Sequence, residues 1–111
     1  MLAPLAVAAA IAGAGAGIPQ APGQCGVIRG RLDLWNGGTP VQIWVVGTRR
    51  MLGVEEPIPG EVTRLLDQAD DRWAISVFGE YRVCAVTRSR PGHRQSVTIV
   101  GTDRLEVRPR P

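Results

Sequence analysis

The segment "RSRPGHR" holds the densest group of side chains in this sequence that could bind a ligand or take part in catalysis. Its cationic members lie within seven residues: Arg88, Arg90, His93 and Arg94. A guanidinium group pairs with phosphate or carboxylate through two parallel N–H bonds. We therefore predict that this segment binds anionic groups, with Arg49 and Arg50 as further candidate members. The alternative is a solvated polar hairpin loop, which Pro91–Gly92 would also favour.

A second candidate site follows from tryptophans set in segments of period two. This spacing puts one set of side chains on the same face of a sheet: Arg31, Trp35, Trp44 and Met51. We expect Arg31 to pack on Trp44 as a cross-strand cation–π pair, within a platform for a sugar, a peptide or a partner surface. The alternative is that a second sheet or a helix covers this face, which would make Trp44 a core residue.

Residues for enzymatic chemistry are sparse. His93 is the single histidine, and no Glu-x-x-His grouping occurs, so a catalytic zinc site lacks ligands. No phosphate-binding glycine loop and no G-x-S-x-G elbow is present. The acid pairs Glu55–Glu56 and Asp70–Asp71 fall in expected loops, where carboxylates are usually solvated. We predict a non-enzymatic protein without metal or cofactor; the alternative is a site assembled in space around His93.

The overall charge narrows the class of partner. The net charge is +3 with an isoelectric point near 9.7, and every basic residue is arginine. Over the whole chain these arginines are interspersed with acids and are not collected in one block, so nucleic-acid binding is not expected. An envelope protein, an acidic glycan or a lipid head group is the expected partner.

The N-terminal segment "MLAPLAVAAAIAGAGAG" carries no charged side chain and ends in small residues. Ala14 and Ala16 occupy the −3 and −1 places of a signal-peptidase site, which predicts export to the periplasm or the medium. No stable transmembrane segment would remain after processing. An uncleaved anchor and a buried N-terminal helix are the alternatives. Gln24 stands before Cys25, where lipidation requires a small residue, so a lipoprotein is not expected.

Cys25 and Cys84 are the only cysteines. In a small exported chain, two cysteines are most simply one disulfide. Closing a loop of about 60 residues removes unfolded-state entropy worth roughly 4 kcal/mol. Two free thiols, one of them buried, are the alternative.

Period-two patterns separated by turn residues predict seven short strands. A two-residue turn at 47–48 sets Ile43 opposite Leu52, and the loop 36–39 sets Leu32 opposite Ile43, so that both hairpins share one aliphatic face. Val62, Leu65 and Leu66 have helical spacing. The expected fold is an all-β, small antiparallel β-sandwich or small barrel with one short helix and one disulfide. The expected strands are 26–35, 41–46, 49–54, 73–78, 81–87, 95–100 and 104–107.

The chain resembles a group of small uncharacterised exported bacterial proteins over most of its mature length. The shared features fall on Gly30–Leu32, Asn36–Gly37, Ile43–Trp44, Gly47–Arg50 and Cys84. A weaker likeness, in the pattern "GRL…NG.P", is to transthyretin-like and carboxypeptidase-regulatory-like β-sandwiches. The first resemblance implies export, the second implies a sandwich fold, and neither implies an activity.

These observations predict a signal peptide over 1–17, a linker over 18–24, a β-sandwich domain over 25–108 and a frayed tail over 109–111. The expected function is an exported, non-enzymatic binding or structural module of the cell envelope. The alternative is a small secreted enzyme inhibitor that inserts the basic loop 88–94 into a cleft.

Overall fold

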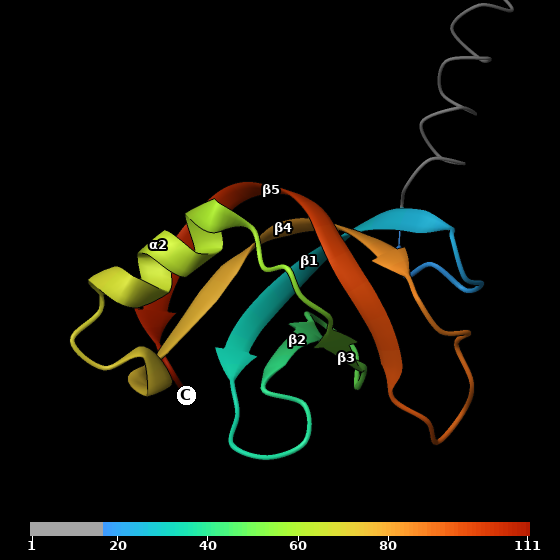
Figure 1. The fold of residues 1–111 in the computed structure, drawn as a ribbon, viewed down its shortest axis with the longest axis horizontal. Coiled ribbons are helices and arrows are strands. Elements are labelled where there is room, and N and C mark those ends of the chain that lie inside the picture. Colours follow the sequence, from blue (N-terminus) through green and yellow to red (C-terminus); the bar gives the residue numbers. More distant parts are fainter. Residues whose placement is uncertain (1–16) are drawn as a thin grey trace, which may run out of the picture.

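The computed structural model describes residues 17–111, so the predicted signal peptide lies outside the described residues except for Gly17. Five strands, one α-helix and one short 3₁₀-helix make up this part of the chain (Figure 1). In order they are β1 (Cys25–Leu34), β2 (Val41–Val45), β3 (Met51–Val54), α2 (Gly60–Gln68), η1 (Arg72–Ala74), β4 (Ile75–Ala85) and β5 (Gln95–Pro109).

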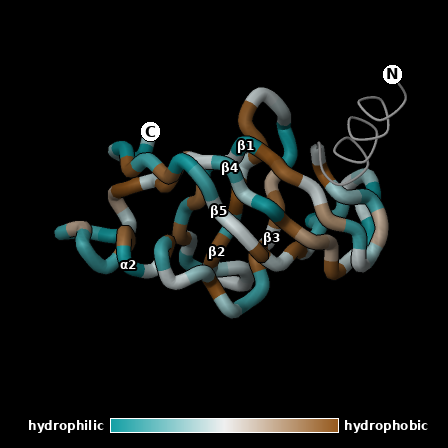
Figure 2. Tube along the Cα trace, turned by 90° about the horizontal axis from the view of Figure 1, so that it is seen from above, coloured by the Kyte–Doolittle hydropathy of each residue, from teal (hydrophilic) through white to brown (hydrophobic). Residues whose placement is uncertain are grey.

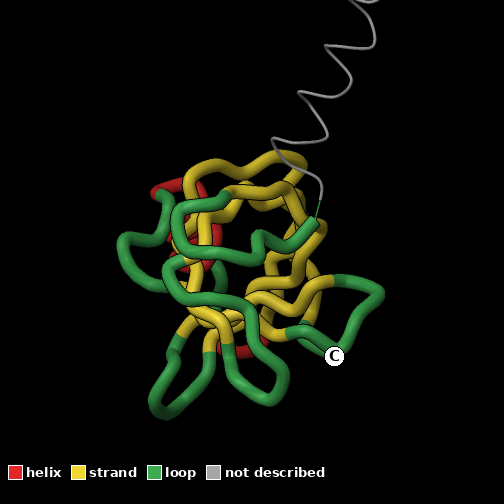
Figure 3. The backbone as a smooth tube through the Cα atoms, turned by 90° about the vertical axis from the view of Figure 1, so that its right-hand side faces the viewer, coloured by secondary structure: helices red, strands yellow, loops and turns green. Residues whose placement is uncertain are grey.

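The five strands form one sheet that closes on itself (Figure 3). Their order around the barrel is β1-β2-β3-β5-β4. Neighbouring strands are antiparallel except β3 and β5, which run parallel. The predicted all-β class with one helix is confirmed. The predicted seven strands and two-sheet sandwich are not found in residues 17–111, where the structure has five strands in a single barrel.

The difference arises because the breaks expected at 79–80 and 101–103, each of which includes a glycine, lie inside two long strands. Gly79 is part of β4 and Gly101 is part of β5. The pairing of these strands shifts between Phe78 and Glu80, which marks a bulge. A Cβ on Gly79 would lie 2.7 Å from Leu105 Cδ2, so glycine permits the close approach of β5 there. Bulges and strand glycines bend a sheet around a barrel without ending the strand.

The predicted hairpin registers are confirmed. Leu32 pairs with Ile43, and Ile43 pairs with Leu52. Gly47 turns the chain between β2 and β3 with φ of 83°, a conformation that favours glycine. The aliphatic side chains of these strands therefore point into the barrel and form its core. The fully buried core residues include Leu32, Ile43 and Leu52 of these strands, and Val77, Tyr81, Val83 and Val97 of β4 and β5.

The helix α2 packs its apolar face on this core. Val62 and Leu66 are buried, as their helical spacing predicts. α2 lies beside β4 and β5 at the opposite end of the barrel from the loop 86–94 (Figure 1). The stretch around α2 is largely hydrophilic (Figure 2), which matches its position on the surface with one side packed.

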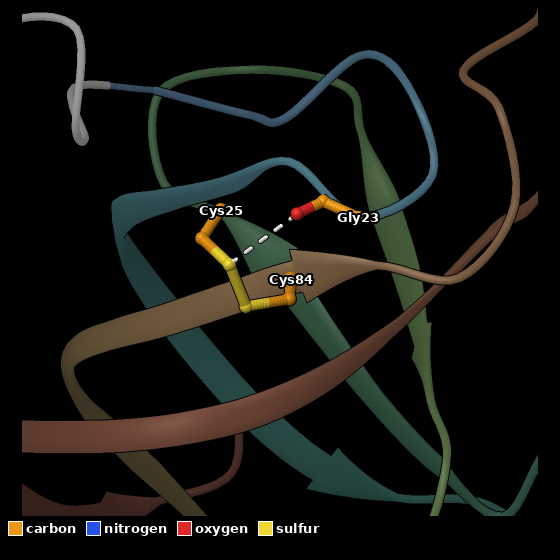
Figure 4. The surroundings of a disulfide bond; sticks show 3 residues. All are labelled: Gly23, Cys25 and Cys84. Carbon is orange, nitrogen blue, oxygen red and sulfur yellow. Dashed lines mark hydrogen bonds between the residues drawn. A yellow bond between two sulfur atoms is a disulfide. The ribbon is translucent and has the colours of Figure 1, made fainter.

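The predicted disulfide is present between Cys25 and Cys84, which are direct partners in the β1–β4 pairing (Figure 4). A disulfide indicates an oxidising compartment outside the cytoplasm. The disulfide lies where β1 begins and β4 ends. The two segments stay paired beyond it, because Gly23 donates its amide proton to the carbonyl of Ala85 over 2.9 Å. The predicted linker 18–24 is therefore packed on the barrel.

The C-terminal tail, predicted to fray, is held at Arg110. Its amide donates to the Ala74 carbonyl over 2.8 Å, and its guanidinium donates to the Leu34 carbonyl over 2.8 Å. Within residues 17–111, no helix is long and apolar enough to cross a membrane.

Candidate anion-binding site

Two basic loops meet at one end of the barrel because of the parallel pairing of β3 and β5. Leu52 of β3 lies opposite Gln95 of β5, so both strands begin side by side. Arg49 and Arg50 immediately precede β3, and Arg94 immediately precedes β5. The structure thus brings together the two groups of arginines that the sequence leaves apart. We name this group the basic end: Arg49, Arg50, Arg88, Arg90, His93 and Arg94.

A surface depression of about 540 Å³ lies between these loops. The loop 46–50, the loop 86–94 and the N-terminal segment at Gln20 all contribute to it. No carboxylate lines it. Its lining residues are Gln20, Arg49, Arg50, Met51, and residues 89–94.

A second depression, of about 360 Å³, adjoins the first. It is lined by Thr87 and Arg88 together with three residues of the first depression, namely Arg90, His93 and Arg94. All four members of the predicted anion-binding segment therefore face this second space.

The arginines of the basic end have no acidic partner within ion-pair distance in residues 17–111. Five arginines elsewhere in this range each lie within 4.0 Å of a carboxylate: Arg31, Arg72, Arg104, Arg108 and Arg110. The sequence explains the contrast, because no Asp or Glu occurs in 34–54 or in 81–102, while seven of the ten acids fall in 55–80. Positive charge therefore gathers at this end, and such a one-sign surface attracts anions.

Gln95 ties the parts of the basic end together. Its side chain is 1% exposed, and its Nε2 donates to the Pro19 carbonyl over 2.7 Å and to the Thr87 carbonyl over 3.2 Å. Its Oε1 accepts from Arg50 Nη2 over 3.0 Å. One amide thus connects the N-terminal segment and both loops. Sequence reasoning missed it, although its place two residues before Val97 in a period-two strand predicts an inward-facing position.

The predicted contact between Arg31 and Trp44 is present on the outer face of the barrel. The guanidinium carbon lies 4.9 Å from the ring centroid, and Trp44 pairs with both Arg31 and Met51 across the strands. Trp44 is half-buried and is not among the core residues. Its indole N–H donates to the Thr48 carbonyl over 2.7 Å. Trp44 thus braces the β2–β3 turn that carries Arg49 and Arg50.

Trp35 lies apart from this pair and packs under Arg110, whose guanidinium carbon is 4.6 Å from its ring. Between the two tryptophan–arginine pairs lies Asp33, which is fully buried. Asp33 accepts a 2.9 Å bond from Arg31 and a bond from the Ser76 hydroxyl, and it lies 4.0 Å from Arg110.

The cations of the tryptophan face are therefore engaged in contacts within the protein. Asp33 compensates Arg31 and Arg110, and each of these guanidinium groups also covers a tryptophan ring. On this face Arg31 and Arg110 are thus paired with Asp33, whereas the arginines of the basic end have no acidic partner in residues 17–111. Asp33, Ser76 and Arg110 are members of the face that sequence reasoning did not identify.

Tyr81 is a titratable residue whose side chain is buried in the core. Its hydroxyl donates to the Val77 carbonyl over 2.7 Å. Burial, and then the negative charge of Asp33, raise the pKa of Tyr81 above its ordinary value. The described part of the chain holds no group of three or more His, Cys, Asp or Glu side chains that could bind a metal ion.

Comparison with known proteins yields no match to a family model, to a curated protein or to a solved structure.

Proposed function

We propose that this protein is an exported, non-enzymatic binding module of the cell envelope. Its basic end binds the anionic groups of an acidic glycan or of a lipid head group. The observation that carries the proposal is the set of five arginines that line two adjoining depressions with no acidic partner in residues 17–111.

The chemistry of arginine supports an oxygen anion as the ligand. A guanidinium group matches the planar or forked oxygens of phosphate, sulfate and carboxylate, and a charge-assisted bond is about twice as strong as a neutral one. Salt weakens the attraction between exposed charges, because it screens them over about 10 Å at 0.1 M. Binding at the basic end should therefore weaken steeply as the salt concentration rises.

The strand order is compatible with a binding role. A closed five-stranded barrel with a helix between β3 and β4 resembles the OB-fold, a class that binds oligonucleotides and oligosaccharides through strands 2–3 and adjoining loops. In this protein, the loop between β4 and β5 and Met51 of β3 line the larger depression. Architecture alone does not determine a ligand. The distribution of charge favours an acidic one.

The test compares two variants of equal net charge. Arg49, Arg90 and Arg94 are changed to Ala in one, and Arg29, Arg64 and Arg82 in the other. The control arginines are exposed, have no ion pair within residues 17–111 and lie outside both depressions. Affinity is measured for a soluble acidic oligosaccharide and for vesicles with anionic lipid, which distinguishes the two sources of the anion.

The first variant should lose about tenfold or more in affinity for one of these ligands, because it removes charge-assisted bonds. The control should lose much less, since its arginines act only through long-range charge. Equal losses in the two variants, or no binding by the unaltered protein, would refute the proposal.

A further inference from the structure

We infer that the basic end binds a ligand that carries two phosphate or sulfate groups on one carrier, with one group in each depression. Arg90, His93 and Arg94 stand between the two groups, and we call these three residues the ridge. The inference rests on the proposed function and specifies the class of ligand.

The division of the arginines between the depressions is the first support. Arg49 and Arg50 line only the larger depression, and Arg88 lines only the smaller one. The ridge residues line both. A single anion in one depression therefore contacts the ridge and the arginines that line that depression alone. A second anion is needed to contact the arginines that line only the other depression.

The size of the two spaces is the second support. Their volumes of about 540 and 360 Å³ fall in the range of small-molecule sites, which is roughly 300–1,000 Å³. Each space holds an anionic group together with part of the carrier to which it is esterified. The carrier would cross the ridge from one depression to the other.

The larger depression is preorganised by the contacts of Gln95. Arg50 is oriented through its bond to this buried amide. The loop is also fixed from the N-terminal segment, because the Ser89 amide donates to the Gln20 carbonyl over 2.9 Å. Fixed side chains and loops lower the ordering cost of binding.

The smaller depression is anchored at the base of its loop. Thr87 Oγ1 accepts from the Ser96 amide over 2.9 Å, and Val86 donates to the Ser96 carbonyl over 2.8 Å. The tip of the loop closes through a 3.2 Å bond from the His93 amide to the Arg90 carbonyl. The ridge is therefore held between two anchored flanks.

Two anions linked on one carrier bind with higher affinity than two separate anions, because the link raises the effective concentration of the second group at its site. Once the first group is bound, the second binds as an intramolecular event, with the largest gain when the carrier length matches the span. Affinity should therefore depend on the length of the carrier as well as on the number of charges, which a diffuse basic patch would not produce.

The experiment titrates the full-length chain calorimetrically with alkanediol bisphosphates of increasing length and with alkyl monophosphates of matched length. At the length that spans the ridge, the bisphosphate should bind about 100-fold more tightly than the monophosphate. Arg88→Ala should remove most of this gain and weaken monophosphate binding to a much smaller extent, because the larger depression, which Arg88 does not line, still binds one anion. Arg82→Ala, an exposed control outside both depressions, should change neither.

A bisphosphorylated disaccharide in solution and vesicles that contain a bisphosphorylated lipid then identify the source of the ligand. Bisphosphates and monophosphates that bind within about threefold of each other at every length would overturn this inference and leave the proposed function standing. If no phosphate, acidic oligosaccharide or anionic vesicle binds, both proposals are wrong.

Discussion

Arg50 and Gln95 lie 45 residues apart in the sequence and are joined by a 3.0 Å hydrogen bond from the guanidinium Nη2 to the amide Oε1. Each residue stands at the start of one of two parallel strands, and Gln95 also donates to the Pro19 and Thr87 carbonyls. The bond couples the barrel to the loops of the basic end. The position of Arg50 is therefore fixed by a buried amide as well as by its loop.

Gln95→Leu should destabilise the fold by about 1–3 kcal/mol, because the carbonyl of the buried Pro19 and the carbonyl of Thr87 both lose their donor. It should also speed amide hydrogen exchange at Ser89, whose loop loses an anchor. Chemical denaturation and hydrogen exchange measure the two effects.

Gln42→Leu is the matched control for this change. Gln42 is also buried, at 7% exposure, but its side chain makes one hydrogen bond within the described residues, to the Thr39 carbonyl. It should cost about 1 kcal/mol or less, the net value of a typical hydrogen bond. Similar losses and similar exchange in the two variants would show that Gln95 is an ordinary buried residue.

Trp44→Ala should cost about 1–2 kcal/mol. The change removes the contact with Arg31, worth about 0.5–1 kcal/mol at a partly exposed site, and the bond to the Thr48 carbonyl, worth about 1 kcal/mol. Equilibrium unfolding in denaturant gives the value. Trp73→Ala, at a ring that is 44% exposed, provides the surface reference. A loss of about 3–5 kcal/mol at Trp44, as core aromatics show, would place its ring in the core instead.

The buried hydroxyl of Tyr81 leads us to predict that the folded protein loses stability at alkaline pH. Burial and the charge of Asp33 raise its pKa in the folded protein above the ordinary value of about 10. The folded state therefore holds this proton more tightly than the unfolded state does. The resulting stability is fully present below about pH 10 and falls by about 1.4 kcal/mol per pH unit as the pH rises above it.

The sequence makes this measurement specific, because it contains one tyrosine and no lysine. Absorbance titration of the phenol should show no ionisation of the folded protein near pH 10, and urea unfolding at a series of alkaline pH values should follow the predicted slope. Tyr81→Phe should remove the slope. A folded protein whose phenol ionises at about pH 10 would contradict the assignment of Tyr81 to the core.

Local sequence patterns predicted the hairpins well. The pairings of Leu32 with Ile43 and of Ile43 with Leu52 follow from turn length and side-chain alternation, both of which are properties of neighbouring residues. The helix around Val62 and Leu66 follows from an equally local signal. The disulfide follows from the count of two cysteines in a chain that is expected to be exported.

Local patterns did not predict the number of strands, and they did not decide between a sandwich and the small barrel that is found. A glycine inside a strand and a glycine in a turn have the same sequence signal, and at Gly79 the packing of Leu105 decides between them. The barrel in turn explains the site. The adjacency of Arg50 and Arg94 depends on the parallel pairing of β3 with β5, a contact between distant segments that no local pattern reveals.

The most direct test of the basic end as the anion site is residue-level mapping by amide chemical shifts in the full-length protein. Pyrophosphate serves as the probe at low salt, where exposed charges are least screened. Shifts should concentrate in the loops 46–50 and 86–94 and at Gln95, and they should be lost in the variant that combines Arg49→Ala, Arg90→Ala and Arg94→Ala. Shifts centred on the tryptophan face, or spread evenly over the barrel, would contradict the account.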